Sequence, residues 1–89
     1  MVRIEKEIVI NNDQGLHARP AALFVQLANK YDCEIVVRKG SNTVNGKSIM
    51  GILMLAAERG SKLMISAEGE DASKAVEELG NFLSSKVAR

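Results

Sequence analysis

The sequence is poor in aromatic residues and almost neutral, and both features limit the partners that the protein can have. Only Phe24, Tyr31 and Phe82 are aromatic, and the formal net charge is +1. Proteins that recognise RNA by base stacking need exposed aromatic side chains, and nonspecific nucleic-acid binding needs a strongly basic surface. We therefore expect no nucleic-acid partner.

The chain has a single cysteine and a single histidine, which are well separated in the sequence. Cys33 has no partner for an internal disulfide and no second cysteine for a zinc or redox motif. It lies in an apolar strand pattern, which predicts a buried structural thiol. The sequence therefore implies neither a metal site nor a cofactor.

Long hydrophobic runs are also missing. No stretch approaches the length of about 18 apolar residues that a membrane span needs. Glu5 and Glu7 interrupt the N-terminal segment, unlike the apolar centre of a secretion signal. We expect a cytoplasmic protein with no membrane partner.

A chain of 89 residues is long enough for one small core, so we expect a single domain that covers residues 1–89. Alternating apolar and polar residues predict strands near residues 2–10, 33–38, 43–45 and 63–67. A turn at residues 39–42 joins the second and third of these strands. In the first strand, Val2, Ile4, Ile8 and Ile10 share the apolar face.

Three further segments have the apolar spacing of helices. The first helix must begin directly after His17, because Pro20 is tolerated only in a first turn. The second is predicted to start after Ser48 as N-cap, to cover the apolar run 49–57 and to stop at residues 58–60. The apolar stripes of the first and third helices are Ala21, Phe24, Leu27, Ala28 and Tyr31, and Ala72, Ala75, Val76, Leu79, Phe82 and Leu83. Gly80 is a mild cost inside the third helix.

The resulting order is β-α-β-β-α-β-α. Strands with one apolar face and helices with one apolar stripe bury those surfaces against each other. We therefore predict an α+β fold, a two-layer open-faced sandwich with three helices on one face of a four-stranded, mostly antiparallel sheet.

His17 lies where a helix is predicted to begin, and this position suggests a chemistry. The first backbone N–H groups of a helix lack intrahelical acceptors and attract anions, phosphate included. Arg19 adds a planar set of donors suited to phosphate oxygens, and a neutral imidazole is a competent nucleophile. The alternative is a histidine with no chemical role near a loop. The abrupt helix start, Gly15 and Arg19 favour a site that accepts a phosphoryl group.

Three segments resemble one family. Residues 15–22 (GLHARPAA), 45–51 (NGKSIMG) and 65–71 (ISAEGED) resemble, in the same order, the histidine site, the regulatory serine site and the last strand of HPr. HPr is the histidine phosphocarrier of the bacterial phosphoenolpyruvate-dependent phosphotransferase system. The likeness covers essentially the whole chain and implies the same open-faced sandwich.

The resemblance implies a role for each site residue. His17 would take a phosphoryl group on Nδ1 from phosphorylated enzyme I and pass it to enzyme IIA domains. Arg19 would position and neutralise the group, and the amides of Ala18 and Arg19 would cap it. The protein would then be a covalent transfer intermediate rather than an independent enzyme. Gln14 stands where several relatives have a hydroxyl residue, so we leave Gln14 out of the predicted site.

The second segment carries a predicted regulatory and docking surface. Ser48 matches the family's regulatory serine, which implies a serine kinase and phosphorylase as partners. The following residues are more apolar than one buried face of a short helix requires, so the helix is either fully buried or partly exposed. In the second case the docking residues beside His17 are Ala22, Lys47, Ile49, Met50 and Leu53. Phosphorylation of Ser48 would then act through surface charge rather than refolding.

Other functions remain open at this point. The nitrogen-related branch of the same system uses a carrier with the same chemistry, and the block 47–50 favours the sugar-linked branch only weakly. A regulatory paralogue works through its phosphoserine alone and lacks the active histidine, so His17 counts against it. A small ligand-binding or RNA-binding domain would need aromatics or a basic stripe. The sequence leaves the downstream sugars and targets open, and we expect a monomer because a carrier must diffuse freely.

Overall fold

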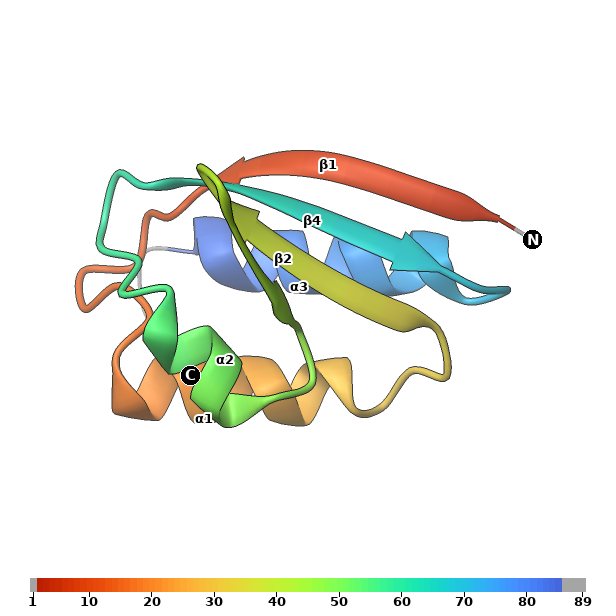
Figure 1. Cartoon of the computed structure of the whole chain (residues 1–89), viewed down its shortest axis with the longest axis horizontal. Coiled ribbons are helices and arrows are strands. Elements are labelled where there is room, and N and C mark those ends of the chain that lie inside the picture. Colours follow the sequence, from red (N-terminus) through yellow and green to blue (C-terminus); the bar gives the residue numbers. More distant parts are fainter. Residues whose placement is uncertain (1, 86–89) are drawn as a thin grey trace.

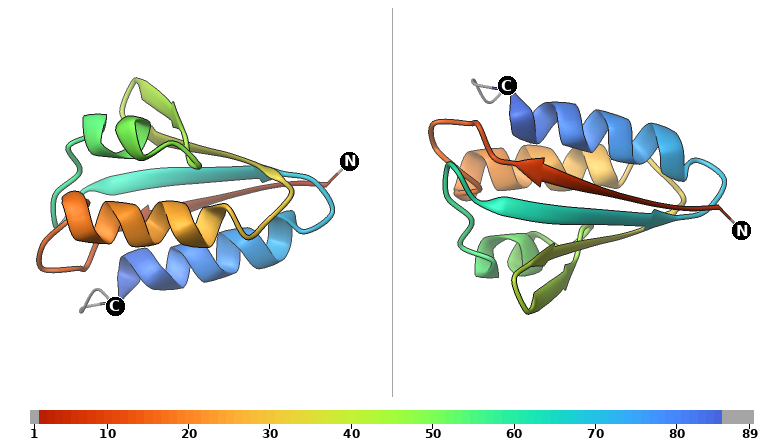
Figure 2. Two further views of the ribbon diagram at one scale, coloured as in Figure 1. Left: turned by 90° about the horizontal axis from the view of Figure 1, so that it is seen from below. Right: turned by 90° about the horizontal axis from the view of Figure 1, so that it is seen from above.

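The computed structural model describes residues 2–85. Its elements are β1 (Arg3–Val9), α1 (Ala18–Ala28), β2 (Glu34–Lys39), β3 (Asn42–Asn45), α2 (Ile49–Met54), β4 (Lys62–Glu68) and α3 (Ala72–Ser84). Within this range the strands form one sheet in the order β1-β4-β2-β3, and every neighbouring pair is antiparallel. The helices lie on one face of the sheet (Figures 1 and 2), which confirms the predicted sandwich. No helix in this range combines the length and apolar character that a membrane crossing requires.

The core lies between the helices and the inner face of the sheet. Alternate strand residues point inward, so one parity of each long strand is buried. The largest buried side chains are Phe24, Ile10, Ile35, Ile52, Leu63, Ile65, Leu79 and Leu83. Val2 shares the parity of Ile8 and Ile10 but is 50% exposed, since it precedes the paired part of β1. The predicted apolar face of this strand is therefore confirmed for Ile4, Ile8 and Ile10 but not for Val2.

Gly80 has a packing role that could not be predicted from its helix propensity. A Cβ added at Gly80 would lie 2.9 Å from Cδ1 of Ile8 on β1. The glycine lets α3 approach β1 closely, and the helix covers the edge of the sheet (Figure 2). Glycine lowers the stability of the helix itself, but here it also allows a closer contact between helix and sheet.

Helix α2 is shorter than predicted. It ends at Met54 rather than Ala57, because Ala56 has φ +49° and turns the chain out of the helix. Lys39 on β2 stabilises this end, since its ammonium donates to the carbonyls of Leu55 and Ala56 at 3.3 Å each. Gly60, predicted as the helix stop, instead belongs to a separate turn with φ +90°.

Tyr31 is half-buried for a reason other than helix periodicity. Helix α1 ends at Ala28, so Tyr31 lies beyond it, and the predicted stripe is too long by one residue. Its hydroxyl donates to the carboxylate of Glu78 on α3. A contact between the segment after α1 and helix α3, rather than a continued helical face, places this side chain.

Candidate functional site

His17 is the N-cap of α1 and is exposed. Its backbone is extended, with φ −83° and ψ −171°, and its carbonyl accepts the first helical hydrogen bond from Ala21 at 2.8 Å. Pro20 is buried and lies in the first turn, where its missing N–H costs no helical hydrogen bond. The helix therefore begins at Ala18, as predicted, and leaves the imidazole at its positive end.

Three groups of hydrogen-bond donors lie next to this imidazole in the sequence and are not used within residues 2–85. The amide N–H groups of Ala18 and Arg19 have no acceptor there, as expected for a first turn. Arg19 is exposed, and its guanidinium makes no ion pair with any of these residues. An oxyanion bonded to the ring would meet donors that need not break another contact first.

The loop before His17 is fixed to the loop that follows α2. Gly15 has φ +66°, and a Cβ at this position would lie 2.7 Å from the carbonyl oxygen of Ala57. Arg59 and Asp13 form an ion pair at 2.9 Å between the same two loops. These contacts position the residue that carries the imidazole, and the sequence analysis assigned no role to Asp13 or Arg59.

Ser48 caps α2, as predicted. Its Oγ accepts the backbone N–H of Gly51 at 3.1 Å, and its side chain is half-buried. The turn before Ser48 also fixes the position of the serine. In this turn the Oδ1 of Asn45 accepts the N–H of Lys47 at 2.8 Å. A phosphate on this oxygen would lie at a helix start, where negative charge is tolerated.

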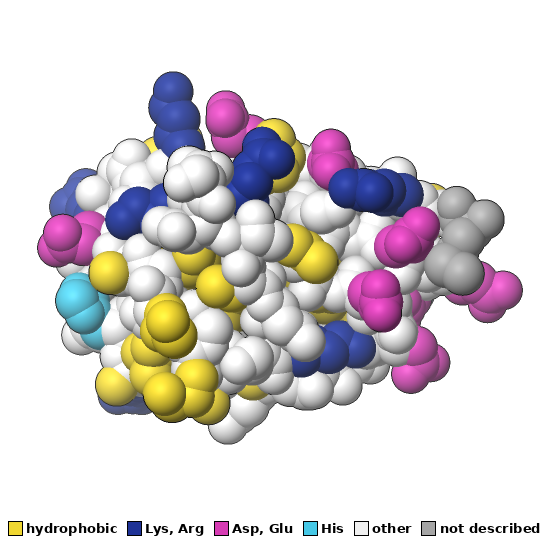
Figure 3. Space-filling view, viewed as in Figure 1, with side chains coloured by type: hydrophobic (Ala, Val, Ile, Leu, Met, Phe, Trp, Pro, Cys, Tyr) yellow, Lys and Arg dark blue, Asp and Glu magenta, His cyan; other side chains and the backbone are white. Residues whose placement is uncertain are grey.

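An apolar surface lies next to the histidine. Figure 3 shows hydrophobic side chains gathered beside the histidine, over the end of the molecule that holds α2. Its exposed members are Ile49 at 38%, Met50 at 65%, Leu53 at 38% and Met54 at 76%. Only Ile52 of this helix is buried, so the alternative of a fully buried helix is wrong. We name these four residues the α2 patch; Met54 was missed, although it lies one helical turn after Met50.

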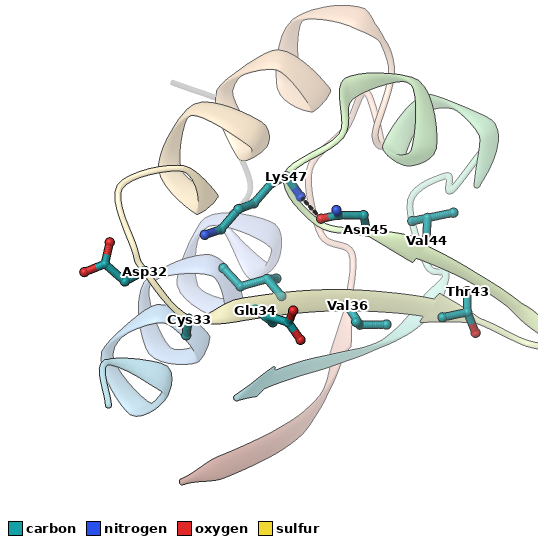
Figure 4. Close-up of a pocket in the computed structure, with 9 residues that line it drawn as sticks. Asp32, Cys33, Glu34, Val36, Thr43, Val44, Asn45 and Lys47 are labelled. Atoms are coloured by element: carbon teal, nitrogen blue, oxygen red, sulfur yellow. Dashed lines mark hydrogen bonds between the residues drawn. The ribbon is translucent and has the colours of Figure 1, made fainter. Parts of the chain in front are cut away.

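The two other residues predicted for docking are less available. Ala22 on α1 is half-buried. Lys47 lines a groove of about 480 Å³ between β2 and β3, and its ammonium donates to the carbonyl of Tyr31. Figure 4 shows this side chain extending towards Asp32 and away from α2. The structure therefore brings the α2 patch together but directs the charge of Lys47 elsewhere.

Cys33 is a buried thiol, as predicted, with 3% exposure. Burial raises the pKa of Cys33 to about 11, and the nearby carboxylate of Asp71 adds to this effect. The thiol is therefore protonated near neutral pH and unreactive. Residues 2–85 contain no group of three or more His, Cys, Asp or Glu side chains arranged to hold a metal ion.

Known proteins share both the sequence and the fold. A family described as "PTS HPr component phosphorylation site" matches residues 4–85. The chain belongs to the HPr family of the phosphotransferase system. It is 45% identical to the HPr-like protein Crh of Halalkalibacterium halodurans over 80 residues, which cover 90% of this chain and 95% of that protein.

Two solved HPr-family structures resemble the fold. The crystal structure of phosphocarrier protein HPr from Bacillus anthracis has a TM-score of 0.90 and 44% identity, and the match covers 93% of this chain and 99% of that one. Bacillus subtilis Crh, described as an intertwined dimer with a swapping domain, has a TM-score of 0.76 and 37% identity over 97% and 99% of the two chains. The HPr family thus includes both phosphocarriers and HPr-like Crh proteins among the relatives of this chain.

Proposed function

We propose that His17 carries the phosphoryl group of this HPr-family phosphocarrier, received on Nδ1 from phosphorylated enzyme I and donated to enzyme IIA domains. The observation that carries this proposal is the exposed imidazole at the start of α1, beside donors that no described residue occupies. The product is a covalent phosphohistidine, and neither a metal nor a cofactor enters the transfer.

The proposed transfer is a displacement at phosphorus. The lone pair of the ring nitrogen forms the new N–P bond while the bond between phosphorus and the donor breaks. Negative charge on the phosphoryl oxygens is stabilised by the amides of Ala18 and Arg19 and by the Arg19 guanidinium. Donation to the acceptor repeats the step in the opposite direction, and the imidazole is regenerated.

The α2 patch and Ala22 form the proposed docking surface for enzyme I and IIA domains. Exposed apolar surface beside a reactive group is typical of a protein-binding site. Methionine suits a surface that must fit several partners, because its side chain adapts its shape. Lys47 belongs to this surface only if docking releases its ammonium from the carbonyl of Tyr31.

Ser48 is the proposed regulatory phosphorylation site, served by a kinase and a phosphorylase. It immediately precedes Ile49 of the α2 patch. A phosphate there would bring two negative charges to an apolar contact and oppose docking, while the helix start would tolerate it. Regulation would act on the surface rather than on the fold.

Two alternatives stay within the family. One is a regulatory module that works through its phosphoserine alone, and two relatives of the chain are HPr-like Crh proteins rather than phosphocarriers by name. A carrier of the nitrogen-related branch would use the same histidine. We favour the sugar-linked carrier because His17 and the Ser48 block occur together. We also propose that it acts in the cytoplasm as a monomer, so that one surface serves successive partners.

The test is phosphorylation of the purified protein by phosphoenolpyruvate and enzyme I. We expect an acid-labile mass increase of one phosphoryl group, which His17→Ala abolishes, and loss of that group when a IIA domain is added. The circular dichroism spectrum of His17→Ala should match the wild type, since the side chain is exposed. A label that persists in the folded His17 variant would contradict the proposal.

A further inference from the structure

Two thioethers dominate the exposed surface of α2. Met50 is 65% exposed and Met54 is 76% exposed, and a spacing of four residues places them on the same side of the helix. Met64, on β4, is half-buried and faces the side of the sheet that the helices leave open. The two most exposed sulfur-containing residues among residues 2–85 therefore belong to the α2 patch, and Figure 3 shows hydrophobic side chains gathered beside the histidine.

We propose that Met50 and Met54 form a reversible oxidation site through which hydroperoxides lower phosphoryl transfer. A sulfur lone pair attacks one peroxide oxygen, an S–O bond forms, and the O–O bond breaks, while the proton of the attacked oxygen moves to the departing hydroxyl group. The thioether becomes a sulfoxide, and hydrogen peroxide is reduced to water. Methionine sulfoxide reductases return the thioether with two electrons from a thiol reductant, which becomes a disulfide, and the sulfoxide oxygen leaves as water, so the site can act as a switch.

The effect of oxidation follows from the polarity of the product, and this step rests on the proposed docking role of the α2 patch. A sulfoxide oxygen is a strong acceptor that must lose its water when a partner covers it. Two such groups in one apolar contact weaken docking. The fold is unaffected, because Ile52, and neither methionine, joins α2 to the core.

The other oxidisable side chains of the described structure are less accessible. Cys33 is 3% exposed, and its thiol stays protonated near neutral pH. Met64 lies on the sheet face opposite the helices, so its oxidation does not alter the α2 patch. Among residues 2–85, loss of transfer after mild oxidation is therefore assigned to the two methionines of α2.

The experiment treats the wild type and a Met50→Leu/Met54→Leu variant with hydrogen peroxide at neutral pH. Peptide mass mapping locates the added oxygen, circular dichroism checks the fold, and phosphorylation by phosphoenolpyruvate and enzyme I gives the rate. Each protein is compared with its own untreated sample. Met64→Leu is the matched control, because it removes a methionine from outside the patch.

We expect oxygen at Met50 and Met54 first, and a wild-type rate that falls by roughly ten-fold. Sulfoxide reductase should restore the rate. The double variant should keep its own starting rate after peroxide, and Met64→Leu should lose rate as the wild type does. An unchanged rate in wild type oxidised at both positions, or an equal loss in the double variant, overturns the inference. If the untreated protein accepts no phosphoryl group, the proposed function fails instead, and this inference fails with it.

Discussion

The backbone N–H of Leu16 donates to the carbonyl oxygen of Ala57 at 2.8 Å. This bond joins the residue before the imidazole to the loop that follows α2. Leu16 is itself buried, with 2% exposure, so the loop is fixed by both polar and apolar contacts. His17 and the α2 patch are therefore held at a defined separation by two buried residues, Leu16 and Ala57.

Substitution of Gly15 tests this anchoring. Gly15→Ala places a methyl group against the backbone at Ala57, at a φ that also disfavours alanine, so we expect a loss of about 2–4 kcal/mol in the free energy of unfolding. Gly40→Ala is the control, because Gly40 has φ +60° but nothing within 4 Å of the added carbon. Its loss should be about 1 kcal/mol. Equal losses in urea unfolding would mean that the close approach is unimportant.

Ala56 carries backbone strain that a single substitution can remove. An L-residue at φ +49° costs the folded state about 1–2 kcal/mol. Glycine removes this strain, but its greater freedom in the unfolded chain offsets part of the gain. Ala56→Gly should therefore stabilise the protein by about 0.5–1 kcal/mol. Ala57→Gly, which deletes a buried methyl one residue further on, should destabilise it. Opposite signs in denaturant unfolding are the expected outcome, and a destabilised Ala56→Gly contradicts this account.

Arg19 is predicted to act on the phosphoryl group and not on the fold. Arg19→Ala removes charge-assisted donors, so transfer from enzyme I should slow by roughly ten- to a hundred-fold. The melting temperature should stay unchanged, because the side chain is exposed and makes no ion pair with the other described residues. Arg38→Ala, which alters an exposed arginine of β2, serves as the control and should transfer at the wild-type rate. Similar slowing in both variants would indicate a general charge effect.

Two substitutions of Ser48 distinguish its capping role from its proposed regulatory role. Ser48→Ala removes the acceptor for Gly51 and should cost about 1 kcal/mol of stability, with little change in transfer. Ser48→Asp keeps a capping oxygen and adds charge beside the α2 patch, so stability should hold while transfer falls by roughly ten-fold. Stability comes from urea unfolding and transfer from the rate of phosphorylation. A slow but destabilised Ser48→Asp would point to unfolding rather than surface charge.

Asp71 makes stability depend on pH. Its pKa lies below the ordinary value, first because its carboxylate accepts the backbone N–H of Asp32 at 2.8 Å, and also because it accepts from Cys33 at 3.0 Å. A folded pKa below the unfolded one gives stability that is present above the unfolded value of about 4 and is lost as pH falls through the folded pKa.

Asp71→Asn should therefore be less stable near neutral pH, and its deficit relative to wild type should shrink as pH falls below about 4. Urea midpoints across this range are the measurement. Glu70→Gln, which removes an exposed neighbouring carboxyl, is the control for net charge. A deficit that stays constant at low pH would show that the carboxylate is not the source of the pH dependence.

The order of elements and the place of the histidine follow from local sequence. Pro20 restricts the start of α1 to the residue after His17, and period-two alternation shows which side chains of a strand share a face. The N-cap role of Ser48 was likewise readable, because capping is a contact between two residues three positions apart, here Ser48 and Gly51. These features depend on atoms close together in the chain.

Tertiary structure decided what depends on distant residues. Helix α2 stops early because Ala56 turns the chain and Lys39, sixteen positions before Leu55, binds the carbonyls at its end. Its spacing alone left open whether the apolar residues were buried or exposed, since burial depends on how the helix lies against the sheet. The loop that carries His17 is held by residues some forty positions away, a pairing that no periodicity encodes. Sequence thus determined which residues stand at the helix start, and packing between distant segments determined the surface that surrounds them.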